Sequence, residues 1–171
     1  MEANPYKELL GEGWSRLSLG ALMAHTVPVC ASGTFSVRHS RGLVGRLIAQ
    51  LLGLPPAGEG KRVRVELQAE GERVRWIRSF DDHTFETLQW RSGDVLIEQV
   101  GSTQMIFRIT EQVGSLVYKQ IGAKWRGMPV PMAMKVAAVA SDSNNGWRVD
   151  VSVRAWPFGE ICTYGGDLSI G

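Results

Sequence analysis

The sequence has few of the features that mark specialised protein classes. Its 2 cysteines among 171 residues, Cys30 and Cys162, are too few and too far apart for a disulfide scaffold or a CxxC redox or metal motif. No apolar run approaches the roughly 18 residues that a membrane-spanning helix requires, so we expect no membrane span. The small number of cysteines favours free thiols, and we therefore expect the protein to be cytoplasmic.

An excess of charge of one sign is also absent. The 19 Lys and Arg against 17 Asp and Glu leave a formal net charge of +2, too little to bind nucleic acid by neutralising phosphates. The 44% hydrophobic and 21% charged residues are typical of a globular chain. We therefore expect one globular domain over residues 1–171 and no nucleic acid partner.

Motifs that hold metals or cofactors are missing as well. The three histidines, His25, His39 and His83, have no metal-ligand spacing, and no glycine-rich phosphate fingerprint follows a predicted strand. The Gly-x-Ser-x-Gly sequence of a nucleophile elbow does not occur. We expect no metal and no cofactor, and the catalytic residues, if any, stay unknown.

Glycine, in contrast, is abundant, with 20 residues, and it accompanies a repeated pattern of short strands. Between Arg62 and Leu168, apolar and polar residues alternate in short segments separated by turn signals, most clearly at Val63, Val65 and Leu67. Asn144-Asn145-Gly146 is typical of a hairpin turn. The pattern predicts about nine or ten antiparallel strands joined by hairpins, with no helix between them.

The first third of the chain has a helical pattern instead. We expect short helices over Pro5–Leu10 and from Trp14 to about His25, and a first strand over Gly33–His39. Apolar stripes from Gly42 to Leu54 predict a helix that packs on the sheet and ends at Gly53.

A sheet this wide in so small a domain must curve to bury its apolar face and limit its edges. We therefore predict a mainly β (α+β) fold in which a strongly curved antiparallel meander forms a calycin-like β-barrel or half-barrel of about 8–10 strands. A START-like helix-grip fold is the alternative. A barrel of this size encloses either packed side chains or one small ligand.

Several segments, in this order, resemble a bacterial family known as domain of unknown function 4166. They are Arg41–Gly58, the pattern Trp76-x-Arg78-x-Phe80, Glu98–Gly101, Pro129-Val130-Pro131 and Tyr164–Leu168, within a similarity from about Trp14 to the C-terminus. The resemblance implies a small domain that occurs alone or behind a saccharopine-dehydrogenase-like module. A dehydrogenase-like protein partner is expected on that ground alone, and the resemblance implies no catalytic residue.

The family pattern places a charge among apolar side chains. Trp76, Arg78 and Phe80 share one strand face with Val74, so burying that face encloses the guanidinium. An enclosed Arg needs a partner, and Glu98, two strands later, is the candidate. The pair either fixes strand register or lets Arg78 bind the acidic or carbonyl head of an apolar ligand.

Aromatic residues near strand ends offer further candidates. Tyr164, beside two glycines, either reaches the same interior with its hydroxyl or packs over glycine at the barrel seam. We expect Trp90, Trp125, Trp147 and Trp156 to cap the core at strand ends.

The leading hypothesis is a module that binds a small apolar or amphipathic ligand, with Trp76, Arg78, Phe80, Glu98 and Tyr164 as its contacts. The alternatives are an enzyme of unknown chemistry in the same pocket, with Arg78 or Tyr164 polarising a carbonyl, and a non-catalytic accessory domain. A large open cavity favours ligand binding, whereas a packed interior favours the accessory domain.

Overall fold

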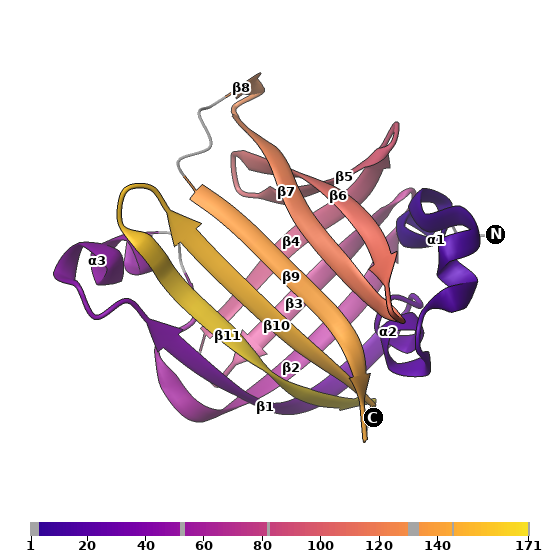
Figure 1. Ribbon diagram of the computed structural model, residues 1–171, viewed down its shortest axis with the longest axis horizontal. Coiled ribbons are helices and arrows are strands. Elements are labelled where there is room, and N and C mark those ends of the chain that lie inside the picture. The colour runs from indigo at the N-terminus through magenta and orange to yellow at the C-terminus, as the bar shows by residue number, and fades with distance from the viewer. Residues whose placement is uncertain (1–3, 52–53, 82, 130–133, 145, 171) are drawn as a thin grey trace.

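The computed structural model describes residues 4–51, 54–81, 83–129, 134–144 and 146–170 (Figure 1). Its helical elements are α1 (Pro5–Leu10), the 3₁₀ helix η1 (Gly11–Arg16), α2 (Leu19–Ala24) and α3 (Leu43–Leu51). Its strands are β1 (Val29–His39), β2 (Gly58–Glu70), β3 (Arg73–Phe80), β4 (His83–Ser92), β5 (Val95–Val100), β6 (Thr103–Gln112), β7 (Ser115–Trp125), β8 (Met128–Pro129), β9 (Met134–Ser143), β10 (Gly146–Ala155) and β11 (Gly159–Ile170).

All strands but the short β8 form one closed antiparallel barrel. The order runs β6-β5-β4-β3-β2-β1-β11-β10-β9-β7, and β6 also pairs with β7, which completes the ring. β8 extends only the end of β7. The structure confirms the predicted meander and shows that it closes, so neither a half-barrel nor the helix-grip alternative forms.

The barrel depends on the pairing of β1 with β11, which joins the two ends of the meander (Figure 1). Glycines bring these strands close together. A Cβ atom at Gly33 would collide with the Asp167 carbonyl oxygen, and one at Gly166 with the Thr34 carbonyl oxygen. Gly166 of the family-like segment is therefore required by the close approach of the β1 and β11 backbones, whereas a Cβ atom at Gly165 would collide with Val149 of β10.

The alternation predicted along the strands places the core inside the barrel. Val63, Val65 and Leu67 of β2 are buried, whereas Arg62 and Arg64 between them are exposed. The interior is therefore apolar by strand periodicity, and any polar residue in the inward phase is enclosed with it.

The N-terminal helices close one end of the barrel, opposite α3 (Figure 1). Asn4 caps α1 by accepting hydrogen bonds from the backbone N–H groups of Tyr6 and Lys7, and Ser18 caps α2. The helix expected from Trp14 to His25 is in fact divided into η1 and α2, because Leu17 has an extended backbone. None of the described helices has the length and apolar character needed to cross a bilayer.

α3 confirms the predicted helix and packs on β11 and β1, but not through the large apolar side chains that the structure describes on it. Leu43, Val44 and Leu47 are exposed, and the helix instead buries Gly45 and Ala49. Gly45 lies against Ser40 and close to Ile161 of β11, so the small residues approach the barrel. The expected helix end at Gly53 and the turn residue Asn145 lie outside the described residues.

The two cysteines are free and far apart. Cys162 is opposite His39 in the β1–β11 register, and Cys30 lies nine residues before His39 on β1. At about 3.3 Å per residue, the two Cα atoms are roughly 30 Å apart, beyond the reach of a disulfide. The expected free thiols are therefore consistent with the register of this seam.

We predict that Gly166→Ala destabilises the protein by about 1 to 3 kcal/mol, because the added Cβ would push the β11 backbone away from Thr34. Chemical denaturation measures this change. The control is Gly13→Ala, whose Cβ would make only ordinary contacts at 3.5 Å and should change stability by less than about 0.5 kcal/mol. Equal stability of the two variants would contradict the seam argument.

Candidate ligand-binding site

The barrel encloses a cavity of about 470 Å³. It extends from His25 and Trp147 near the N-terminal helices to Leu54, His83 and Met134 at the other end. Most of its lining is apolar, and much of that comes from the inward-facing residues of β9 and β10. The volume lies in the range of small-molecule sites, about 300 to 1,000 Å³.

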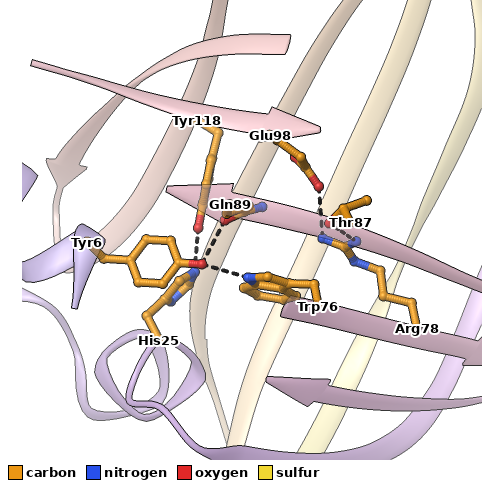
Figure 2. A network of polar contacts seen from close by, with 8 residues as sticks. All are labelled: Tyr6, His25, Trp76, Arg78, Thr87, Gln89, Glu98 and Tyr118. Atoms are coloured by element: carbon orange, nitrogen blue, oxygen red, sulfur yellow. Dashed lines mark hydrogen bonds and ion pairs between the residues drawn. The ribbon is translucent and has the colours of Figure 1, made fainter. Parts of the chain in front are cut away.

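One ion pair lies in this apolar lining, between β3 and β5 (Figure 2). Arg78 donates from its Nη2 atom to Glu98 Oε1 at 3.3 Å and from its Nη1 atom to Thr87 Oγ1 at 3.0 Å. The two charged side chains are only 15% and 12% exposed. The structure thus confirms that Arg78 is enclosed and paired with Glu98, as its strand phase predicts.

Two aromatic rings contact the Arg78 guanidinium by cation–π interactions. The Arg78 Cζ atom lies 4.7 Å from the centre of the Trp76 ring and 5.2 Å from that of Phe85. Such contacts attract a cation to the ring faces and restrict its position. Arg78 is therefore held in one place at the wall of the cavity.

The other sequence-predicted contacts also line the cavity. Phe80 is 2% exposed, and its ring meets the ring of Tyr164 edge-on with centroids 5.9 Å apart. Tyr164 also stacks on Phe35 at 6.4 Å, next to the glycine seam. The Tyr164 hydroxyl forms no hydrogen bond with any of the described residues. Burial raises the pKa of Tyr164 to about 12, so its hydroxyl stays protonated near neutral pH.

A second polar network joins the N-terminal helix α1 to the barrel wall (Figure 2). Trp76 Nε1 donates to the Tyr6 hydroxyl at 2.6 Å, and that hydroxyl donates to Gln89 Oε1 at 2.7 Å. Burial raises the pKa of Tyr6 well above its usual range, so it stays a neutral donor. The network fixes Trp76, and through its ring the position of Arg78.

His25 and Tyr118 form a third buried contact at this end (Figure 2). His25 Nδ1 lies 2.9 Å from the Ala21 carbonyl oxygen, so Nδ1 carries the proton and Nε2 accepts from the Tyr118 hydroxyl at 2.6 Å. Burial lowers the pKa of His25 to about 4. Both ring nitrogens are engaged in hydrogen bonds, so His25 joins α2 to the barrel wall and has no free nitrogen to act as a base in the cavity.

Among the polar groups of the lining that can contact an occupant are Arg78, Thr87, Glu98 and Tyr164. Trp147 adds an N–H donor. It lines the cavity, is fully buried, and its Nε1 atom has no hydrogen-bond partner in the described part of the chain. Within the same residues, no cluster of three or more His, Cys, Asp or Glu side chains is arranged to hold a metal ion. The arrangement can hydrogen-bond a polar group inside an apolar chamber.

Sequence reasoning missed five members of these networks: Tyr6, His25, Thr87, Gln89 and Tyr118. Thr87 and Gln89 share the inward phase of Phe85 in β4, which is a signal that strand alternation carries. Tyr6 and His25 lie in or beside short helices, where no periodicity indicates a contact across the barrel.

We predict that Arg78 and Glu98 stabilise the fold together. Arg78→Ala and Glu98→Ala should each destabilise by about 3 to 5 kcal/mol, because each leaves an enclosed charge without its partner. The double variant should cost less than the sum, with a coupling of at least about 1 kcal/mol in denaturation experiments. The exposed pair Arg148–Asp150, at 2.9 Å, is the control and should couple by less than that. Additive effects at Arg78 and Glu98 would show that the pair does not act as a unit.

We also predict a loss of stability in mild acid that depends on His25. The unfolded chain takes up a proton near the ordinary pKa of 6.5, whereas the folded protein does so only near 4. Stability is therefore complete above about pH 6.5 and falls by about 3 kcal/mol as the pH is lowered to about 4. Denaturation at several pH values should show this fall in wild type and in His39→Gln, but a smaller one in His25→Gln. An identical fall in His25→Gln would exclude His25 as its source.

Comparison with known proteins identifies a family for this chain. A search of curated proteins finds no match. Among solved structures, the chain is similar to a secretary abundant heat soluble (SAHS) protein from Ramazzottius varieornatus, at 12% identity and a TM-score of 0.42, over 82% of this chain and 94% of that one. The sequence model of the family described as "Domain of unknown function (DUF4166)" matches residues 21–168. The chain therefore belongs to the DUF4166 family.

Proposed function

We propose that the protein binds a small apolar or amphipathic molecule inside the barrel. The observation that carries this proposal is the cavity of about 470 Å³, mostly apolar in lining, with one held ion pair in its wall. The residues expected from the sequence, Trp76, Arg78, Phe80, Glu98 and Tyr164, all border this space. They would supply the contacts to the ligand.

The charges in the wall favour a ligand whose polar end is neutral. Glu98 already neutralises Arg78, so a carboxylate entering the cavity would leave one uncompensated negative charge away from water. A hydroxyl or carbonyl group can instead accept from Arg78 or Tyr164 without breaking the pair. The apolar part would then lie along β9 and β10, which line the cavity with small aliphatic side chains such as Ala138 and Val151.

The alternatives receive less support from the same geometry. A non-catalytic accessory domain would be expected to have a packed interior, and this interior has room for an occupant. An enzyme would need a base or nucleophile open to the cavity, and the buried His25 does not supply it, because both its nitrogens are engaged in hydrogen bonds. Ligand binding uses the groups that remain available.

We predict that Nile red, a neutral fluorescent probe of apolar sites, binds one site per chain. Ala138→Trp should weaken this binding about ten-fold or more, because the larger side chain overfills the cavity that Ala138 lines. The matched control is Ala137→Trp, since Ala137 is the next residue on β9 and is exposed on the outer face. Fluorescence titration measures both affinities.

Ala138→Leu keeps the test decisive if the tryptophan variant does not fold. It should bind Nile red with an affinity between those of wild type and Ala138→Trp, and a thermal unfolding transition confirms that each variant is folded. Equal binding by wild type and folded Ala138 variants would place the probe outside the barrel and contradict the proposal.

A further inference from the structure

The end of the barrel opposite the N-terminal helices has an exposed apolar rim. We define the rim by eight residues from four separate segments: Leu43, Val44 and Leu47 of α3, Val100 at the end of β5, Trp125 and Met128 at the β7–β8 turn, and Trp156 and Phe158 at the β10–β11 turn. In Figure 1, α3, β8 and the β10–β11 turn all project at this end, away from α1 and α2.

The rim contains most of the large apolar side chains that the described residues expose. Only Leu19, Val113 and Ile121 are exposed elsewhere. Leu43 and Trp156 are each 82% exposed, and the exposure of Trp125 and Trp156 is contrary to the expectation that they cap the core. Exposed apolar residues gathered at one end mark an interaction surface, since single ones scatter over a surface.

Basic residues surround the rim. Arg38, Arg41, Arg46, Arg126, Lys135 and Arg154 are exposed at this end, and none has an ion-pair partner within the ranges that the structure describes. The acidic residues described here are Glu59, Glu160 and Asp81, and Asp81 pairs with Lys61 and Arg62.

The closed end has the acidic residues Glu8, Glu12, Glu70, Glu72, Asp94, Glu111 and Asp142 beside the basic residues Lys7, Arg16, Arg73 and Arg91, and two of these basic residues form the ion pairs Arg91–Glu8 and Arg16–Glu111. A net charge of only +2 therefore hides a positive end and a more acidic end.

The apolar rim and the basic residues around it together indicate which kind of partner can bind this end of the barrel. A second copy of the chain placed rim to rim would bring the two sets of basic residues together, which opposes association. A bilayer with anionic headgroups attracts the basic residues, and its interfacial region accepts Leu, Phe, Met and Trp side chains. Charge complementarity thus favours a lipid surface.

We propose that the rim docks the protein on the surface of a membrane that contains anionic lipid. The apolar side chains enter the interface and the surrounding arginines and lysines contact headgroup phosphates. The end of the cavity lined by Leu54 and Met134 then lies next to the lipid, which would let an apolar molecule pass between bilayer and barrel without crossing water. The docking surface does not depend on what the cavity binds.

Co-sedimentation of the full chain with phospholipid vesicles tests this proposal. Vesicles of phosphatidylcholine mixed with phosphatidylglycerol should bind the wild type at low salt, and binding should weaken as salt is added. Leu43→Ser/Phe158→Ser should weaken binding about ten-fold or more, because two apolar side chains no longer enter the interface. Arg46→Glu/Arg154→Glu should weaken it by at least about five-fold for each residue changed.

Matched controls come from the closed end. Leu19→Ser/Val113→Ser removes two apolar side chains that are also largely exposed, and Lys7→Glu reverses an exposed charge there, so both variants should bind as the wild type does. Equal losses in the rim and control variants would overturn the proposal, as would equal binding to vesicles of phosphatidylcholine alone. A wild-type dimer that Leu43→Ser/Phe158→Ser converts to monomer would assign the rim to a second copy and also overturn it.

Discussion

The pairing of β1 with β11 is the constraint on which the rest of the molecule depends. It joins the two ends of a meander and turns a sheet into a closed chamber. The approach is so close that Gly33 and Gly166 have no room for a side chain. Without this seam the inward faces of the strands would meet water, and neither the cavity nor the enclosed charge would exist. The family-like segment Tyr164–Leu168 thus contributes to the pairing that closes the barrel.

Closure also explains why the interior holds an ion pair. Arg78 lies in the inward phase of β3 between Trp76 and Phe80, so the closed barrel encloses it, and Glu98, Thr87 and two aromatic rings compensate its charge. A pair of this kind contributes little stability that apolar residues could not supply. Its place in the wall of the cavity is the reason for proposing an occupant with a polar end.

Strand periodicity made much of this predictable from sequence. Alternation and turn residues were sufficient to predict the antiparallel meander. The shared strand face of Trp76, Arg78 and Phe80 was sufficient to predict that Arg78 is enclosed and paired with Glu98. Contacts between distant segments follow no such period, which is why Tyr6 and His25 were missed.

The packing of α3 on the sheet was predicted, but the side chains that it buries were not, for a different physical reason. Amphipathicity indicates that a helix has an apolar face but not what covers it, and here Leu43 and Leu47 face outward at the barrel mouth. For Trp125 and Trp156, a position at a strand end likewise does not indicate whether the side chain turns toward the core or toward solvent, and both belong to the exposed rim.

A crystal structure of the protein grown with decan-1-ol would show what the barrel interior accepts. We expect the alcohol inside the barrel, with its hydroxyl within hydrogen-bonding distance of Arg78 or Tyr164 and its chain along β9 and β10. An interior filled by the protein's own side chains, or alcohol bound only on the outer surface, would contradict this expectation.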